Sequence, residues 1–267
     1  MDDRRLGWLV GPGKKVFIWI GALLLILIAW QGVIVVTGLP AYIIPPPGVA
    51  FSTLHENWPL YGKLLKQTLL ETSVGYVLGA SFGFLLALLM GQFRVVRMLV
   101  VPAMIVSQAV PIVAIAAPLV IIFGFGIVPK LIIVAWIVFF PVVVSVLDGL
   151  SAIDRDALNL ARLMGGGGLR TFLIVKLPAC VGPLFSGLKI GATYAVTGAV
   201  IGEWTASSER GLGTYLLAAN AQMDTAGVYA AVLLLTAVGV GSFLLVLGIE
   251  ILATPWRHRA IAPRWAR

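Results

Sequence analysis

Six long apolar runs constrain the fold of this chain more than any other feature of its sequence. They cover about residues 16–38, 67–91, 98–123, 128–147, 179–203 and 228–252. Each run holds the roughly 20 mostly apolar residues that a helix needs to cross the hydrocarbon core of a bilayer. Because 60% of all residues are hydrophobic and the mean hydropathy is +1.03, a soluble globular domain is excluded. The sequence predicts an all-α integral membrane protein with six transmembrane helices.

The positions of the basic residues predict how these helices are oriented. The net charge of +8 is compatible with nucleic-acid binding, but the Lys and Arg residues lie in short segments between the apolar runs, which is the pattern of membrane orientation. If the N-terminus is cytoplasmic, the inside segments hold Arg4, Arg5, Lys14, Lys15, Arg94, Arg97, Arg155, Arg162, Arg170, Lys176, Arg257, Arg259, Arg264 and Arg267. The outside then holds Lys63, Lys66, Lys130 and Arg210, while Lys189 lies within the fifth run.

This bias of fourteen positive residues to four predicts that both termini are cytoplasmic. The predicted organisation is a cytoplasmic tail of residues 1–15, a transmembrane domain of residues 16–252 and a second cytoplasmic tail of residues 253–267. The expected environment is a lipid bilayer, and no nucleic-acid partner is expected.

Prolines single out the third and fourth runs. The third contains Pro102, Pro111 and Pro118, and the fourth contains Pro141. Proline removes a backbone donor and kinks a helix, and broken helices at membrane depth are tolerated only against protein or a cavity. We therefore expect these two runs to be inner helices. Residues 39–66, which are rich in proline, should form a long external connection that carries a short interfacial helix.

Residues 148–178 form the longest polar stretch inside the transmembrane domain. Asp154 is placed to cap the start of a short helix, and the glycine run 165–168 should stop it. Leu177 and Pro178 begin the next apolar run, with proline near the first turn of the helix. The apolar residues that fall on one face of the short helix are Leu160, Leu163 and Met164. The segment therefore has the pattern of a docking element.

The spacing within this segment resembles the EAA loop of binding-protein-dependent ABC transporter permeases. That pattern is Glu-Ala-Ala, three residues, Gly, nine residues, then an aliphatic residue, any residue and Leu-Pro. Here Asn159, Leu160 and Ala161 occupy the triplet, Gly165 follows after three residues, and residues 175–178 (Val-Lys-Leu-Pro) close the pattern. The acid and the first alanine of the triplet are replaced, but the spacing is kept.

The resemblance implies a type I ABC importer permease fold in a cell inner membrane, with residues 148–178 as a cytoplasmic coupling loop. It implies that the chain is a non-catalytic transport subunit that binds no cofactor, with ATP and Mg on a separate ATPase. No Gly-x4-Gly-Lys-Ser/Thr phosphate loop occurs in the sequence. The implied partners are a second, identical permease subunit, two ABC ATPase subunits and a periplasmic or lipid-anchored substrate-binding protein. The implied ATPase-coupling residues are Asp154, Asn159, Leu160, Ala161, Arg162, Leu163, Met164, Gly165, Leu177 and Pro178.

Two further stretches, residues 107–130 and 191–213, are similar to the nitrate/sulfonate/taurine-type branch of these permeases. Within the branch they look most like members that carry thiamine pyrimidine precursors. The resemblance implies a small polar solute. A pyrimidine precursor and an alkanesulfonate or taurine are the two leading candidates, with nitrate or bicarbonate behind them.

Polar residues inside the apolar runs are the candidates for a substrate pathway, because ionisable groups there are costly and functional by default. Glu203 lies near the external end of the fifth run, where it either faces an aqueous pathway or marks the interface. Lys189 is expected to snorkel or to brace the coupling region, and Glu71 to face the headgroups. The residues predicted to line the pathway are Ser107, Gln108, Tyr194 and Glu203.

The small residues of the fifth run should let neighbouring helices approach closely. They are Gly191, Ala192, Gly198, Ala199 and Gly202. The single cysteine, Cys180, excludes an internal disulfide and is expected to fill space inside a helix bundle.

Two other classes of protein remain as alternatives. A membrane-embedded enzyme is disfavoured because the only histidines are His55 and His258, and neither His-Glu-x-x-His nor Gly-x-Ser-x-Gly occurs. No catalytic or metal-binding residue is predicted. An ion-coupled secondary transporter is the main alternative function, although it would usually show inverted repeats and more intramembrane acids.

Overall fold

The structure is a computed structural model that describes residues 12–206 and 209–255, without the side chains of residues 12–20, 22, 23, 155 and 162. All regular elements in these ranges are helices. In chain order they are α1 (Pro12–Thr37), α2 (Pro47–Glu56), α3 (Trp58–Gln92), α4 (Arg94–Ala109), α5 (Ile112–Phe123), α6 (Ile127–Ser151), α7 (Arg155–Leu163), α8 (Gly168–Thr171), the π-helix η2 (Phe172–Lys176), α9 (Leu177–Ala206), α10 (Leu212–Ala221) and α11 (Thr225–Ala253).

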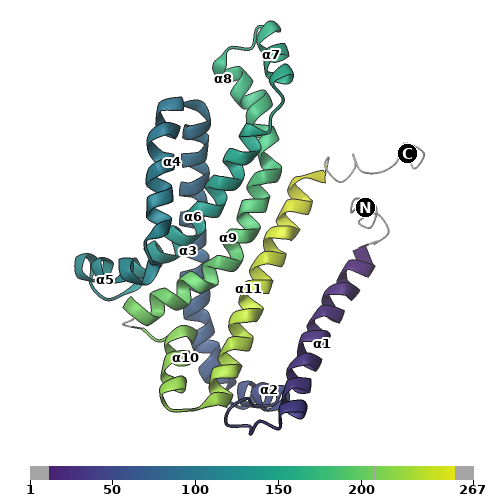
Figure 1. Cartoon of the computed structure of the whole chain (residues 1–267), viewed down its shortest axis with the longest axis vertical. Coiled ribbons are helices and arrows are strands. Elements are labelled where there is room, and N and C mark those ends of the chain that lie inside the picture. Colours follow the sequence, from purple (N-terminus) through teal and green to yellow (C-terminus); the bar gives the residue numbers. More distant parts are fainter. Residues whose placement is uncertain (1–11, 207–208, 256–267) are drawn as a thin grey trace.

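The long helices alternate in direction along one axis of the molecule (Figure 1). The short helices α7 and α8 lie at one end of this axis, and α2 and α10 lie at the other (Figure 1). The first turn of α1 and the last turn of α11 both point toward the end that carries α7 (Figure 1). The described ends of α1 and α11 thus point toward the end that carries α7, and the side of the membrane on which this end lies stays a prediction. The predicted tail residues 1–11 and 256–267 lie outside the described residues.

The predicted count of six transmembrane helices is approximate. Among the described residues, four helical segments are long and apolar enough to span a bilayer: α3, α6, α11 and the continuous helix Gly168–Ala206, which includes α9. The third predicted span is two helices, α4 and α5, that bend by 98°. The break falls at Val110 and Pro111, where proline removes a helical donor. The first predicted span corresponds to α1, whose fully described apolar part is Leu24–Thr37.

The core is formed by α6 held between α3 and α9, with glycines at both contacts. A Cβ atom added at Gly79 of α3 would lie 2.5 Å from the carbonyl oxygen of Ala135, and one at Gly198 of α9 would lie 3.0 Å from the α6 backbone. Gly75 and Gly83 repeat this contact one turn before and after Gly79. The predicted close approach at the fifth run is therefore confirmed. The matching glycine row on α3 was not predicted.

Only one of the two proline-containing runs lies inside this chain. In α6 ten residues are buried, whereas Met104 is the buried residue of α4 and Ala116 that of α5. The prediction of inner helices is therefore confirmed for α6 and wrong for α4 and α5 within this subunit. The break at Pro111 turns α5 out of the line of α4, at the side of the bundle (Figure 1). Cys180 fills space in the core between α4, α6 and α9, as predicted.

The external connection predicted at residues 39–66 contains the expected short helix, α2. The following span begins earlier than predicted, because α3 starts at Trp58 and continues for 35 residues. This longer helix changes the surroundings of the polar residues near its start.

Candidate functional site

Residues 148–178, which we call the coupling segment after the role that the resemblance implies, have the local structure that their sequence predicts. The Asp154 side chain accepts a hydrogen bond from the backbone N–H of Asp156 at 2.9 Å, which caps α7. At the other end Gly165 has φ +81°, in the left-handed region, and the N–H of Gly166 donates to the carbonyl of Ala161 at 2.9 Å. This six-to-one bond across a left-handed glycine is a Schellman motif. Both ends of α7 are thus fixed by groups of the segment itself.

The apolar side chains of α7 are exposed. Leu163 is 86% exposed and Met164, just after the helix, is 78% exposed. Leu160 and Met164 border an open hollow of about 330 Å³ between α7 and the following helical turns, with Arg170 and Ile174 on its far side. Asn159 is exposed on the same short helix, and the Arg162 side chain lies outside what the structure describes. The segment therefore presents apolar surface that its own chain does not cover.

The last part of the coupling segment, from Gly168 onward, is continuous with α9. Leu177 and Pro178 are the first two residues of α9. Pro178 has no N–H to donate, and the turn before it is wider than an α-helix, with the N–H of Leu177 bonded to the carbonyl of Phe172. A π-type turn of this kind is frequent at functional positions in helices. The structure therefore joins α8 to α9 by continuous helix, while the turn at residues 164–167 separates α8 from α7.

Two of the predicted pathway residues meet in a second hollow. Gln108, at the end of α4, and Tyr194, on α9, line an open hollow of about 430 Å³ together with Ser145 of α6. Ser107 is turned back to its own helix, because its hydroxyl donates to the carbonyl of Met104 at 2.7 Å. Ser145 was not predicted, although a lone serine in the apolar fourth run was a signal for it. The hollow lies where α4, α6 and α9 border one another.

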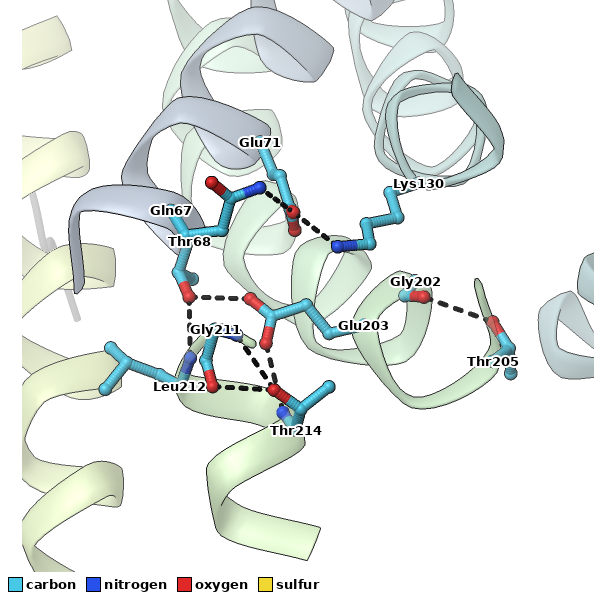
Figure 2. Close-up of polar contacts among 10 residues, drawn as sticks. All are labelled: Gln67, Thr68, Glu71, Lys130, Gly202, Glu203, Thr205, Gly211, Leu212 and Thr214. Atoms are coloured by element: carbon cyan, nitrogen blue, oxygen red, sulfur yellow. Dashed lines mark hydrogen bonds and ion pairs between the residues drawn. The ribbon is translucent and has the colours of Figure 1, made fainter. Parts of the chain in front are cut away.

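Glu203 lies inside the protein and away from both hollows. It is 1% exposed, and one carboxylate oxygen accepts a hydrogen bond from the Thr68 hydroxyl at 2.6 Å (Figure 2). The other oxygen accepts from the backbone N–H of Thr214 at 3.0 Å, in the first turn of α10, where a helix favours a negative charge. The Thr68 hydroxyl also accepts from the N–H of Leu212 at 2.9 Å. This network joins α3, α9 and α10, and such burial does not support the predicted pathway role of Glu203.

An ion pair lies beside this network. The ammonium of Lys130 on α6 is 2.7 Å from a carboxylate oxygen of Glu71 on α3, and the two side chains are 1% and 0% exposed (Figure 2). The Gln67 amide donates to the same oxygen at 2.8 Å. The expectation that Glu71 faces the headgroups is wrong, because α3 begins nine residues earlier than predicted and Glu71 lies well inside it. Lys130, assigned to the external side by its sequence position, is likewise buried.

A second ion pair joins α9 to α11. The ammonium of Lys189 is 2.6 Å from a carboxylate oxygen of Glu250, and both side chains are largely buried. Lys189 therefore links α9 to α11, and the expectation that it snorkels or braces the coupling region stays a prediction. Its partner on the last apolar run was not predicted, because sequence spacing does not show which face of a distant helix packs against α9.

The chain resembles known transport proteins over most of its length. Residues 79–254 match the family described as "Binding-protein-dependent transport system inner membrane component". A probable ABC transporter permease protein of Haemophilus influenzae is 38% identical over 84% of this chain and 90% of its own length. The formylaminopyrimidine transport permease protein ThiX of Halalkalibacterium halodurans is 31% identical over 88% of this chain and 94% of its own. The putative aliphatic sulfonates transport permease protein SsuC of Bacillus subtilis is 27% identical over 85% and 84%.

These relatives confirm the resemblance that the coupling segment suggested, including its branch. The family supplies the membrane-embedded permease components of ABC transporters, which work with ATPase and substrate-binding partners, and this function displaces the ion-coupled alternative. On the match of its residues 79–254 and the identity of its relatives, the chain belongs to the binding-protein-dependent transport system inner membrane component family, as a permease component of an ABC transporter for small solutes.

Proposed function

We propose that this chain is the membrane-spanning permease subunit of an ATP-driven importer, and that the exposed apolar face of α7 binds its ATPase. The observation that carries the proposal is the construction of α7, a short helix fixed at both ends whose side chains Leu160 and Leu163 face away from their own chain. Burying one such side chain against a partner contributes about 1.5–3 kcal/mol. The remaining coupling residues of the segment, from Asp154 to Pro178, hold this face and connect it to α9.

The working complex contains a second copy of this chain, two ATPase subunits and a substrate-binding protein that is periplasmic or lipid-anchored. The uncovered apolar surface of α4 and α5 supports a second permease copy, since residues such as Leu99 and Ile121 are exposed there. ATP and Mg bind to the ATPase subunits, and this chain neither hydrolyses ATP nor binds a cofactor. The complex lies in the inner membrane with α7 and both tails on the cytoplasmic side, as the distribution of basic residues indicates.

Transport follows from the connection between α7 and α9. ATP binding draws the two ATPase subunits together, and α7 moves with the surface that it contacts. The movement passes through the π-type turn to α9, which carries Tyr194 on its exposed face. Rotation or tilt of α9 then opens the pathway toward the binding protein. The pathway residues are Gln108 and Tyr194, which border one hollow, with Ser107 beside them.

The transported solute is small and polar. A pyrimidine precursor and an alkanesulfonate or taurine are the leading candidates, and nitrate or bicarbonate is less supported. The names of two relatives, a formylaminopyrimidine permease and an aliphatic sulfonates permease, support these two classes.

A matched pair of substitutions tests the ATPase contact. Leu163, on α7, and Met223, at the opposite end of the molecule, are each 86% exposed. Leu163→Asp should abolish co-purification of the ATPase with the permease, because a carboxylate in an apolar contact costs several kcal/mol. Met223→Asp should leave co-purification unchanged. If the Leu163→Asp permease retained its ATPase as the unsubstituted protein does, α7 would not be the docking element.

A further inference from the structure

One face of α9 is both exposed and polar, which is unusual in so apolar a chain. At 3.6 residues per turn, the exposed residues of its middle turns fall on one side of the helix, so they form a single stripe. They are Ser186, Ile190, Thr193, Tyr194, Thr197 and Trp204. Four of these six side chains carry a hydroxyl group, and Tyr194 is 52% exposed. The Ser186 and Thr193 hydroxyls donate to carbonyls of their own helix, but a hydroxyl oxygen that donates can still accept a hydrogen bond from water or a polar solute.

The stripe continues into the hollow that α9 shares with α4 and α6. Gln108 contributes an amide and Ser145 a hydroxyl to this hollow, and Phe140 contributes an aromatic ring beside Tyr194. An amide and a hydroxyl each donate and accept hydrogen bonds. Together, the stripe and the hollow form one wall of uncharged polar groups and aromatic rings, which we call the α9 wall.

The buried and half-buried charged groups of α3, α6, α9 and α11 lie elsewhere and have partners. Lys130 is paired with Glu71, and Lys189 is paired with Glu250. Glu203 is buried between Thr68 and Thr214. Among the described residues that line the stripe and the hollow, none carries a charge. A permanent anion that passed along the α9 wall would meet no cation to replace its water, at a cost of several kcal/mol.

We propose that the α9 wall is the solute-contacting surface of the pathway and that it admits an uncharged planar heterocycle, of the aminopyrimidine class, rather than a permanent anion such as a sulfonate. The inference rests on the proposed function as an importer permease and selects between its two leading solutes. A flat ring stacks on Tyr194 or Phe140, while Gln108 and Ser145 satisfy ring nitrogens and amino groups. Tyr194, Gln108 and Ser145 are then the residues that determine specificity.

Accessibility to water tests whether the wall lines a pathway. In a Cys180→Ala background, Thr193→Cys and Thr197→Cys in the complete transporter should react with a charged, water-soluble thiosulfonate reagent. The matched control is Leu85→Cys, on the exposed face of α3, which should remain unreacted in lipid. Absence of reaction at both threonine positions, or disulfide formation between two copies at Thr197→Cys, would show a subunit interface and overturn the inference.

Charge and hydroxyl substitutions test the solute class. Uptake is measured in proteoliposomes that hold the permease, its ATPase and its binding protein, with a neutral aminopyrimidine and with ethanesulfonate, a permanent anion. We expect ATP-dependent uptake of the pyrimidine alone, reduced by both Gln108→Lys and Gln108→Glu. Tyr194→Phe, which removes one hydroxyl, should reduce it about three- to tenfold, whereas Tyr229→Phe, whose ring stacks on Trp30 away from the wall, should not.

The outcomes separate this inference from the proposed function. ATP-dependent uptake of ethanesulfonate, with Gln108→Lys as active as the unsubstituted protein and Gln108→Glu inactive, would overturn the uncharged solute class and leave the importer function intact. Equal uptake by the Tyr194→Phe and Tyr229→Phe proteins would remove Tyr194 from the pathway. ATP hydrolysis by the complete complex without uptake of any solute would overturn both proposals.

Discussion

The helical core and the coupling segment differ in how their side chains are covered by the rest of the chain. In the core, glycines of α3 and α9 bring backbones close to α6, and the acids there are bonded to groups of the same chain. In the coupling segment, α7 is held by its own cap and glycine stop, and its apolar side chains remain uncovered. The core is packed within a single subunit, whereas the apolar surface of α7 is left uncovered by the described residues.

This difference predicts where the effects of substitutions should appear. A change in the core should lower the free energy of unfolding of the subunit and reduce transport only through that loss. A change in the coupling segment should leave the subunit folded and remove ATPase coupling. Four predictions follow in order of decreasing effect on the stability of the isolated subunit.

The largest loss of stability is expected from Lys130→Met. The substitution leaves the carboxylate of Glu71 buried without its cation, and breaking a buried pair in this way costs about 3–5 kcal/mol. Thermal unfolding of the subunit in detergent measures the effect. The double variant Glu71→Met with Lys130→Met removes both charges and should recover most of the stability. If the double variant were as unstable as the single one, packing rather than charge would explain the loss.

A smaller loss is expected from Gly79→Val, because the added side chain meets the α6 backbone at Ala135 and pushes two core helices apart. Overpacking of this kind costs about 1–3 kcal/mol. The matched control is Gly241→Val on α11, where an added Cβ atom meets no other atom within 4 Å. The amount of folded subunit per cell and its unfolding temperature distinguish the two. Equal stability of the two variants would contradict the glycine-mediated packing of α3 on α6.

Much of this core was predictable, because helix length and close approach are local properties of the sequence. The apolar runs placed most of the spanning helices, and the glycines of the fifth run predicted their close packing. The bend of α4 against α5 was not predicted, since Pro111 signals a break but not its angle. The buried position of Glu71 was also missed, because the apolar run in the sequence begins nine residues after the first residue of α3.

In the candidate site, too, the local features were predictable from the sequence and the contacts between distant helices were not. The cap at Asp154 and the left-handed Gly165 were predicted because both depend on neighbours in sequence. The partners of Glu203, Lys130 and Lys189 come from helices distant in sequence, so spacing alone did not reveal them. The coupling role of residues 148–178 and the predicted pathway roles stay predictions, since they concern partners and a solute outside this chain.

A loss of stability similar in size to that of Gly79→Val is expected from Glu203→Gln. The amide keeps one acceptor but places a donor against the N–H of Thr214 or the hydroxyl of Thr68, and loss of a hydrogen bond to a charged group costs about 1.5–3 kcal/mol. Uptake per folded complex should be unchanged, because Glu203 is buried in the core. Normal thermal stability together with reduced uptake would instead return Glu203 to the substrate pathway.

The smallest effect on stability, together with a large loss of ATPase coupling, is expected when the glycines that end α7 are replaced. Valine at position 165 cannot adopt φ +81° without strain, and Gly166 has no space for a side chain because a Cβ atom there would lie 2.6 Å from the carbonyl oxygen of Ala161. The double variant Gly165→Val with Gly166→Val prevents the stop from shifting by one residue. The subunit should insert and unfold at its usual temperature, because the core does not include α7, while solute-stimulated ATPase activity of the assembled complex falls by about tenfold or more.

Gly167→Val is the matched control, since Gly167 has φ −62° and open space around it, and it should couple normally. A double variant that still couples ATP hydrolysis to uptake would show that α7 is not the transmission element and would erase the distinction between the two regions.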